Sequence, residues 1–400
     1  MSGSTKPALL GGEPVRAERL PFFRSSFTEA EIDAVLDTLR SGWLTVGPKT
    51  ASFREEFLAS TNLPYGLPLN SCTSAMLLAL KILGIGEGDE VITSPNTFTA
   101  TVSVIHQAGA TPVLADIELE TYGLDPASVE AAITGRTKAI LAVHYGGQPC
   151  EIEALREIAD RRKLLLIEDV AHGFGAELDG RQIGFHGEAS AFSFYATKNL
   201  STGEGGFLSC ATKELEDEAS LMGFHGMDRD AWKRYGDRGG WYYEVKRFGY
   251  KFNMTDIQAA MGQVQLARAV ELREARRAVV TRFQEAFSGR SELILPLTRR
   301  GALHSWHLFV PRLAEGALRI GRDEFLKALT AEGISPSLHF IPIHHHPAHR
   351  EFLGDLSEKL PASEAFYEGC FSLPLFPTMS VKETDQVIEA VHKLLDYYRI

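Results

Sequence analysis

Lys198 stands in a turn between two apolar runs, where its amine can be presented to a pocket. Glycines within 203–206 give that turn the conformational freedom and close backbone approach of a tight loop. Asp169, twenty-nine positions earlier, follows the apolar run 164–167, which predicts a buried strand. Because α/β sheets bind ligands at the carboxyl ends of their strands, we expect the carboxylate and the amine to meet at one site.

An amine and a carboxylate placed in this way suit one cofactor, pyridoxal phosphate (PLP). The lysine forms a Schiff base with the aldehyde, and the acid keeps the pyridine nitrogen protonated so that the ring withdraws electrons. Each residue alone has an ordinary alternative, since most lysines are solvated and an aspartate after a strand is often a turn or cap residue. Together with their flanking segments, Lys198 and Asp169 are predicted to be the catalytic pair.

The segment 70–74, Asn-Ser-Cys-Thr-Ser, precedes an apolar helical pattern over 75–81. It predicts a helix N-terminus whose free N–H groups, dipole and hydroxyls hold a phosphate dianion. The alternative is an ordinary Ser/Thr cap. Cys72, Thr73 and Ser74 are therefore expected at the phosphate of the cofactor.

Phe98 follows the strand-like run that begins at Val91, so its ring is expected near the end of a strand. An aromatic ring at this place can stack on the pyridine of the cofactor. A simple core residue is the alternative interpretation, because most phenylalanines are buried for packing alone.

The composition is that of a soluble enzyme. The chain has 400 residues, of which 44% are hydrophobic and 23% charged, enough for two domains. A net charge of −11 without a basic stripe argues against nucleic-acid binding. Four widely separated cysteines form no CxxC pair, which favours a reducing cytoplasm. We find no signal-like stretch at the start and no apolar run of about eighteen residues, and so expect no membrane span.

Helical and strand patterns alternate from residue 27 to residue 210. Such alternation predicts a mainly parallel sheet with helices on both faces. The expected helices are 28–40, one that begins at 126, and 151–161, and the expected strands are 111–117, 139–143 and 164–167.

A capping box at 255–258 opens a helix that we expect to continue to about residue 287. After it the pattern changes to short strands and two helices. We therefore predict a large α/β domain over 1–265, which includes an N-terminal arm, and a smaller α+β domain over 266–400.

These segments carry a family resemblance along nearly the whole chain. The sequence resembles the DegT/DnrJ/EryC1/StrS aminotransferases, the sugar-aminating branch of the type I PLP-dependent (aspartate aminotransferase) fold. The resemblance implies that fold, with a mainly parallel seven-stranded sheet in the large domain. It rests on five segments in the family's order, 41–48 (SGWLTVGP), 168–172 (EDVAH), 193–206 (SFYATKNLSTGEGG), 249–256 (GYKFNMTD) and 372–377 (SLPLFP).

The resemblance also implies a role for each site residue. Lys198 would hold the cofactor, Asp169 would pair with its ring nitrogen, and His172 would lie near its ring hydroxyl. Thr45 and Gly47, in the first matching segment, are expected to bind substrate. The full set of expected cofactor contacts is Cys72, Thr73, Ser74, Phe98, Asp169, His172, Ser193, Lys198, Lys251 and Asn253.

The segment 251–253 matches the strand that, in the family, reaches across to the phosphate of a neighbouring subunit. The resemblance therefore implies a homodimer with shared sites. Here Lys-Phe-Asn replaces the commoner Asn-x-Arg pattern, so either Lys251 or Asn253 makes that contact. Cys72 likewise stands where glycine is frequent.

Histidines crowd the segment 339–349. Adjacent histidines in an extended segment point in opposite directions, which is poor geometry for chelation, so we expect no metal site. In the family this segment borders the active site, and His344 is therefore expected to orient substrate. His307, in a strand-like run, is as consistent with a hydrogen-bonded core residue.

The residues and the resemblance together predict an aminotransferase. It would take the amino group of L-glutamate, a donor implied by the resemblance alone, and transfer it to a nucleotide-linked keto-deoxysugar. The cofactor would alternate between PLP and pyridoxamine phosphate (PMP). The segment 249–256 resembles members that act at carbon 4 more than those that act at carbon 3, which favours a 4-keto substrate.

Three alternatives have different expectations. PMP-dependent sugar dehydratases carry histidine in place of the Schiff-base lysine, so Lys198 argues against them. PLP-sensing regulators resemble fusions with an N-terminal DNA-binding domain, and few residues here precede the part that resembles the family. A cyclitol aminotransferase that acts on a ketoinositol remains compatible with the sequence.

The stretch 225–247 mixes aromatic and basic residues that suit a nucleotide diphosphate. An ordinary surface loop is an equally good interpretation. The residues concerned are Trp232, Arg234, Tyr235 and Trp241.

Overall fold

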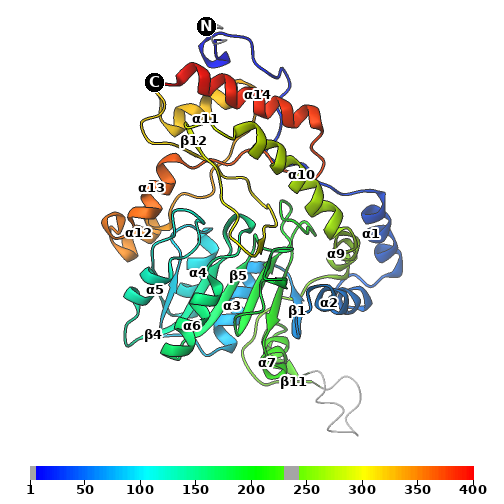
Figure 1. The fold of residues 1–400 in the computed structure, drawn as a ribbon. Helices are drawn as coiled ribbons and strands as arrows, with labels where there is room; N and C mark the ends of the chain where they lie inside the picture. Colours follow the sequence, from blue (N-terminus) through cyan, green and yellow to red (C-terminus); the bar gives the residue numbers. More distant parts are fainter. Residues whose placement is uncertain (1–5, 229–242) are drawn as a thin grey trace.

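A seven-stranded sheet forms the centre of the larger part of the protein (Figure 1). The structure, a computed structural model, describes residues 6–228 and 243–400. In spatial order the strands are β1 (Tyr65–Leu69), β9 (Gly206–Cys210), β8 (Ala189–Ser193), β5 (Leu165–Val170), β4 (Thr137–Val143), β2 (Glu90–Thr93) and β3 (Thr111–Leu114). The pairings from β8 to β3 are parallel, whereas β9 runs antiparallel to both β1 and β8. The predicted mainly parallel seven-stranded sheet is confirmed.

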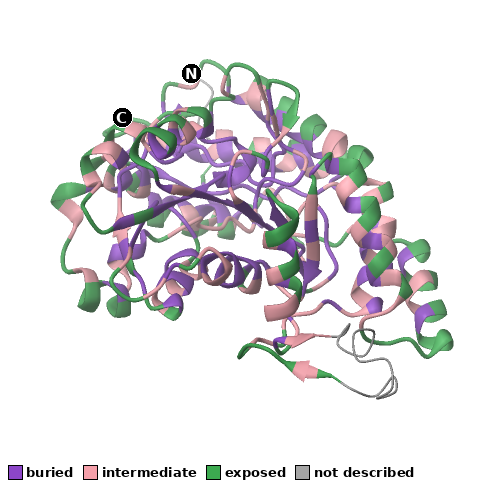
Figure 2. Ribbon diagram, turned by 90° about the horizontal axis from the view of Figure 1, so that it is seen from below, coloured by how far each residue is buried: buried purple, intermediate pink, exposed green. Residues whose placement is uncertain are grey.

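Each face of the sheet has its own apolar core, because side chains alternate along every strand. On β4, Leu141 and Val143 belong to one core, and Ile140 and Ala142 belong to the other. Figure 2 shows buried residues along the sheet and on the inward sides of its helices. The first face is covered by α3 (Cys72–Ile82), α4 (Thr99–Ala108) and α7 (Lys213–Met222), and the second by α2 (Pro48–Thr61), α5 (Pro126–Ala132), α6 (Ile152–Arg162) and α9 (Asp256–Ala267).

The strand that carries Asp169 is longer than predicted. The apolar run 164–167 predicted a strand that stops before the carboxylate, but β5 continues through Asp169 to Val170. It does so because β5 pairs with β8 along 167–170, and the buried polar side chains of Glu168 and Asp169 both find hydrogen-bond partners inside the protein. The strand expected over 111–117 is shorter than predicted, since β3 ends at Leu114.

The single helix expected over 255–287 is two helices. The predicted capping box at Thr255 opens α9, but α9 ends at Ala267, and α10 (Ala269–Phe287) begins after Arg268. Arg268 has φ of −100° and ψ of 4°, outside the helical range. The expectation of one continuous helix is wrong because the two halves serve different cores: α9 packs with α2 beside the sheet, and α10 packs in a separate core away from the sheet.

That separate core brings together the C-terminal part of the chain and Leu20 of the N-terminal arm. Val280 and Phe283 of α10 contact apolar residues of α11 (Arg322–Ala331) and α14 (Val381–Tyr398). No described helix is both long and apolar enough to cross a membrane. The remaining elements are α1 (Glu29–Ser41), α12 (Pro347–Leu353), α13 (Pro361–Gly369), the 3-10 turns η1 (Ala8–Leu10), η2 (Tyr145–Gly147), η3 (Ile343–His345) and η4 (Ser357–Lys359), and the short strands β6 (Glu177–Leu178), β7 (Arg181–Gln182), β10 (Met227–Asp228), β11 (Glu244–Val245), β12 (Leu293–Ile294), β13 (Ala302–Leu303) and β14 (Arg312–Leu313).

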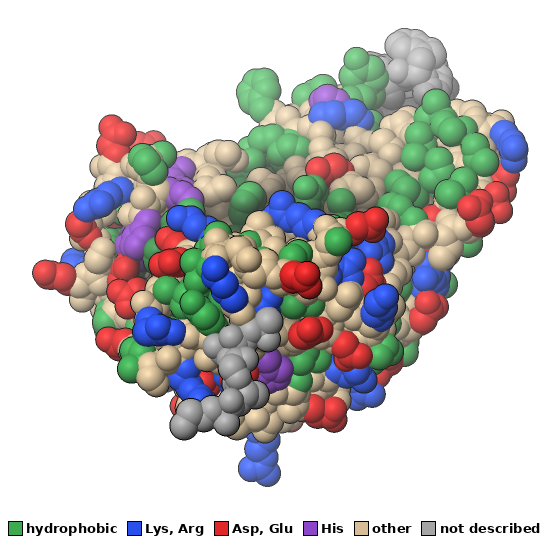
Figure 3. Space-filling model, turned by 90° about the horizontal axis from the view of Figure 1, so that it is seen from above, with side chains coloured by type: hydrophobic (Ala, Val, Ile, Leu, Met, Phe, Trp, Pro, Cys, Tyr) green, Lys and Arg blue, Asp and Glu red, His purple; other side chains and the backbone are tan. Residues whose placement is uncertain are grey.

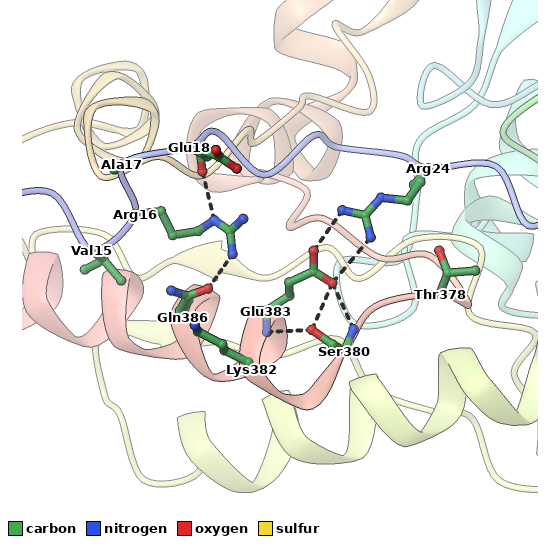
Figure 4. A pocket seen from close by; sticks show the side chains of 10 residues that line it. All are labelled: Val15, Arg16, Ala17, Glu18, Arg24, Thr378, Ser380, Lys382, Glu383 and Gln386. Carbon is green, nitrogen blue, oxygen red and sulfur yellow. Dashed lines mark hydrogen bonds and ion pairs between the residues drawn. The ribbon is translucent and has the colours of Figure 1, made fainter.

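The N-terminal arm lies against α14, so segments near the two ends of the described chain are neighbours in space (Figures 1 and 4). Arg24 forms an ion pair of 2.8 Å with Glu383, and Arg16 donates a hydrogen bond to Gln386. A hollow of about 570 Å³ between the arm and α14 is lined by these paired groups. Its polar side chains therefore hold the arm in place.

Candidate active site

A cavity of about 490 Å³ opens at the carboxyl ends of the central strands, and we call it the Lys198 cavity. It lies where sheets of this kind bind ligands, with a segment of the C-terminal part of the chain at its mouth. Several residues predicted from separate parts of the sequence share it, namely Cys72, Thr73, Phe98, Asp169, His172, Ser193 and Lys198.

The turn between β8 and β9 places Lys198 in the cavity. The N–H of Lys198 donates to the carbonyl of Tyr195 at 2.9 Å, and the N–H of Thr202 returns to the carbonyl of Phe194 at 2.9 Å. Gly203 has φ of +79°, which L side chains rarely adopt. Burial lowers the pKa of the Lys198 amine to about 8, although the carboxylate of Asp169 opposes the shift. Near neutral pH much more of this amine is unprotonated than in an ordinary lysine, and that is the form that attacks an aldehyde.

Asp169 is a buried carboxylate that faces the same cavity. One oxygen accepts a hydrogen bond of 2.8 Å from the hydroxyl of Thr101, and the other accepts one of 3.0 Å from the N–H of Ala171. Burial raises the pKa of Asp169, while these two hydrogen bonds oppose the rise. Among the residues that the structure describes, Asp169 forms no ion pair, and the more distant charge of Lys198 only partly offsets the effect of burial on its pKa. A protonated pyridine nitrogen is the kind of cation that this carboxylate lacks.

His172 presents a defined tautomer to the cavity. Its Nδ1 accepts a hydrogen bond of 3.2 Å from the N–H of Gly146. Burial, together with the charge of Lys198, holds the pKa of His172 well below its ordinary value, so the ring is neutral. A neutral ring that accepts at Nδ1 carries its proton on Nε2. His172 can therefore donate one hydrogen bond to an oxygen of a ligand.

The N-terminus of α3 forms the end of the cavity that is suited to bind a phosphate. Ser71 caps the helix by accepting the N–H of Ser74 at 3.1 Å, whereas the amides of the first turn have no acceptor within the helix. Gly206 lets β9 approach this turn, because a Cβ there would lie 2.4 Å from the carbonyl carbon of Ser71. Thr73 and Ser193 line the same cavity. Free amides and hydroxyls beside a helix dipole suit a dianion, so the residues present fit the phosphate of PLP.

Some cavity residues were missed or left open by sequence reasoning. Thr101, which bonds Asp169, gave no signal beyond a hydroxyl in an apolar helix. His339 and Phe340 close the mouth, and their distance along the chain left no local signal. The ring of Phe340 lies 5.9 Å from that of Phe98, between centroids. His307, for which a core role was equally expected, is buried but lines the cavity.

Other predicted residues lie outside the Lys198 cavity. Gly47 and Asn253 line a separate hollow of about 650 Å³, which we call the Asn253 hollow. The carbonyl of Thr45 accepts the N–H of Asp256 at 3.0 Å, which ties the loop before α2 to the start of α9.

Two further predicted cofactor contacts also lie outside the Lys198 cavity. Lys251 donates a hydrogen bond to Asn253. Ser74 takes part in the cap of α3 but does not line the cavity. Trp232, Arg234, Tyr235 and Trp241 lie outside the described residues.

His344 does not line the Lys198 cavity either. It lies in the 3-10 turn η3, and its Nε2 is 2.5 Å from an oxygen of Glu364. The expectation that neighbouring histidines point in opposite directions is wrong here, because the segment is helical rather than extended. Nε2 of His345 is 2.7 Å from the same oxygen.

Comparisons with known proteins agree with this architecture. The model of the DegT/DnrJ/EryC1/StrS aminotransferase family matches residues 25–392. The spore coat polysaccharide biosynthesis protein SpsC of Bacillus subtilis is 45% identical over 94% of this chain and 97% of its own length.

Solved structures are similar over nearly the whole chain. The PMP form of Spr1654 from Streptococcus pneumoniae, described as a sugar aminotransferase, has a TM-score of 0.90 at 34% identity, with 94% of this chain and 99% of that chain covered. PseC of Helicobacter pylori, an aminotransferase of pseudoaminic acid biosynthesis, has a TM-score of 0.89 at 26% identity, with 95% and 100% covered.

Fold and site together define a PLP-dependent enzyme of the transaminase class. The chain belongs to the DegT/DnrJ/EryC1/StrS aminotransferase family. PLP is accordingly its cofactor.

Proposed function

We propose that this enzyme moves an amino group from L-glutamate to a nucleotide-linked keto-deoxysugar, with the 4-keto sugar favoured over the 3-keto sugar. The observation that carries the proposal is the shared cavity of Lys198 and Asp169 in a chain of this family. The descriptions of its relatives, which name a spore coat polysaccharide, a sugar aminotransferase and pseudoaminic acid, support a sugar acceptor.

We assign the roles of the residues as follows. When bound, the protonated pyridine ring of PLP supplies an electron sink for the substrate's α-carbon. Asp169 would hold the proton on the ring nitrogen by its negative charge, and the Nε2–H group of His172 would donate a hydrogen bond to the ring oxygen. The amides of Cys72 and Thr73 at the start of α3, with the hydroxyls of Thr73 and Ser193, would bind the phosphate. Phe98, which lines the same cavity, would pack on the ring.

Lys198 has two duties in this proposal. It would anchor the cofactor through its amine, and once free, the same amine would accept the proton from the α-carbon of the amino acid and pass it to the cofactor. A pKa near 8 suits both duties, because the amine can gain and lose a proton near neutral pH. In the second half of the reaction the same amine would carry a proton in the opposite direction, from the cofactor to the carbon of the sugar.

The Asn253 hollow supports the proposal of a homodimer with shared sites. Gly47 and Asn253 face one hollow, and neither lines the Lys198 cavity of its own chain. Thr45, Gly47, Lys251 and Asn253 would then serve substrate or phosphate by reaching the cavity of a second protomer. The contact of Lys251 with Asn253 supports their acting as one unit.

Mixed dimers test the shared site. Lys198→Ala should be combined by co-expression with the double variant Lys251→Ala/Asn253→Ala, each inactive alone. In a heterodimer one cavity collects both lesions, and the other keeps its own lysine beside an intact partner segment, so up to half of the wild-type activity should return. Purified heterodimers without activity would contradict shared sites.

The substrate class is tested by the acceptor. Purified enzyme with L-glutamate should form 2-oxoglutarate when a nucleotide-linked 4-ketosugar is supplied, more slowly with the 3-ketosugar. Turnover with scyllo-inosose and none with the nucleotide sugars would instead identify a cyclitol aminotransferase.

All four cysteines are free, which supports the further proposal of a cytoplasmic location.

A further inference from the structure

A cluster of two histidines and a glutamate lies outside the Lys198 cavity, beside α12 and α13. We propose that His344, His345 and Glu364 bind one divalent transition-metal ion of the zinc type. Among the described residues, these three form the group whose potential ligand atoms all lie within 4.8 Å of one another. Figure 3 shows histidine side chains gathered on this side of the molecule, seen from above.

The ligand atoms converge because the turn η3 brings the Nε2 atoms of both histidines to the same carboxylate oxygen. The His344 and His345 rings are nearly perpendicular, at 81°, with centroids 4.7 Å apart. Their Nε2 atoms lie 2.5 and 2.7 Å from Oε1 of Glu364. In the metal-free protein both imidazoles share one carboxylate oxygen by hydrogen bonds. A cation bound between them needs each Nε2 atom to move away from Oε1 only slightly, to about 3.3 Å, the edge of a tetrahedron with metal–ligand distances near 2.0 Å.

The donor set matches the chemistry of a borderline-soft cation. Two neutral imidazoles and one carboxylate are ligands that zinc takes in proteins, with a remaining position for water. The side chain of His344 is 1% exposed, whereas those of His345 and Glu364 are 27% and 26% exposed. The site is therefore held at a buried ligand, His344, while the partly exposed His345 and Glu364 leave it open to solvent.

The backbone on each side of the cluster is held in place. The N–H of Ile343 donates to the carbonyl of Pro95 at 3.0 Å, which fixes η3 on the loop after β2. At the start of α13, Asp116 accepts the N–H groups of Ala362 and Ser363, both at 2.9 Å. The ligands thus lie on two segments that are anchored independently of the metal, so little ordering is needed on binding.

One feature limits the affinity. Nδ1 of His344 is buried and has no hydrogen-bond partner in the described part of the protein. A metal at Nε2 moves the proton to Nδ1, where it would be unsatisfied, whereas ligating histidines usually donate that proton to a partner. We therefore expect a dissociation constant in the micromolar range.

A bound metal would join η3 to α13. The segment that leads into η3 carries His339 and Phe340, which lie at the mouth of the Lys198 cavity. The metal is thus expected to brace that wall of the cavity without contacting the cofactor.

Equilibrium dialysis of the untagged holoenzyme against Zn²⁺, with elemental analysis, tests the site. Glu364→Gln and His345→Ala are the test variants, and His346→Ala is the matched control, since it removes a neighbouring imidazole that is not part of the group. We expect one ion per chain in the wild type and in the control, and at least tenfold weaker binding in both test variants. Thermal unfolding without metal verifies that each variant is folded.

PLP can itself bind metal ions, and the variants separate that binding from the proposed site because all of them keep the cofactor. No zinc uptake by the wild type would overturn the proposal. So would uptake that is equal in the wild type and in folded Glu364→Gln and His345→Ala, or that is lost as strongly in His346→Ala.

Discussion

Two adjacent carboxylates on β5 face opposite sides of the sheet and have different surroundings. Glu168 is fully buried and accepts hydrogen bonds from the N–H groups of Gly184 at 2.8 Å, His186 at 2.7 Å and Gly187 at 2.8 Å. His144 adds a fourth at 2.9 Å. Asp169 has two close hydrogen bonds, and it borders the Lys198 cavity.

The pKa values of the two groups differ in direction for this reason. Burial raises the pKa of Glu168, but the hydrogen bonds from His144 and the backbone outweigh burial and hold that pKa below its ordinary value. The pKa of Asp169 is raised, because its hydrogen bonds do not offset burial. Glu168 is thus satisfied by the protein alone, whereas Asp169 needs a cation that the cofactor can bring. Burial of a carboxylate does not by itself mark a site; incomplete satisfaction beside a cavity does.

The largest effect is expected at Lys198, which acts with Asp169. Lys198→Ala removes both the anchor and the proton acceptor, so kcat should fall by about 10⁴-fold and the visible absorbance of the lysine-bound cofactor should disappear. Lys213→Ala, on the exposed surface of α7, is the control and should behave as the wild type. Turnover retained in Lys198→Ala, with the fold intact by circular dichroism, would refute the assignment.

Asp169→Asn should be the next most severe change. The amide keeps the shape of the side chain but not its charge, so the protonated ring nitrogen loses its partner. We expect kcat to fall by about 10²- to 10³-fold with part of the cofactor still bound, as measured by steady-state kinetics and cofactor content. A kcat near that of the wild type would contradict the role of the carboxylate.

Glu168→Gln should separate stability from chemistry. The new NH₂ group would face N–H donors, so we expect the free energy of unfolding in urea to fall by about 3 kcal/mol, with kcat within a few-fold of the wild type. Since the folded pKa of Glu168 is lowered, its contribution is present above the unfolded pKa of about 4.3 and is lost as pH falls through the folded value. A variant as stable as the wild type but inactive would reverse the comparison.

The smallest effect is expected in the pH dependence of cofactor binding, which the pKa of Lys198 sets. Because only the unprotonated amine attacks the aldehyde, the rate at which cofactor-free protein regains visible absorbance with PLP should rise with pH and level off above about 8. Stopped-flow absorbance between pH 6 and about 10 measures this profile. A midpoint near the ordinary lysine value would show that burial does not tune this amine.

Most residues of the cavity could be predicted because their local structure is determined within short segments of the sequence. The glycine-containing turn around Lys198 and the cap of α3 at Ser71 are both set by neighbouring residues. The positions of His339 and Phe340 at the mouth of the cavity depend on tertiary packing, which no periodicity in the sequence indicates. The break at Arg268 was hidden because the helical pattern continues on both sides while the core that it faces changes.

The histidine segment shows the same limit. Adjacent residues diverge in a strand and approach each other in a tight turn, so the predicted geometry of His344 and His345 depended on an element that the sequence did not specify.

The central claim is that Lys198 carries the cofactor in the cavity that it shares with Asp169. Borohydride reduction of the holoenzyme fixes the cofactor to the amine that holds it, and digestion followed by mass spectrometry locates the modified residue. The account predicts one phosphopyridoxyl group per chain, on the peptide that contains Lys198. A label on another lysine, or no label in protein that contains PLP, would contradict it.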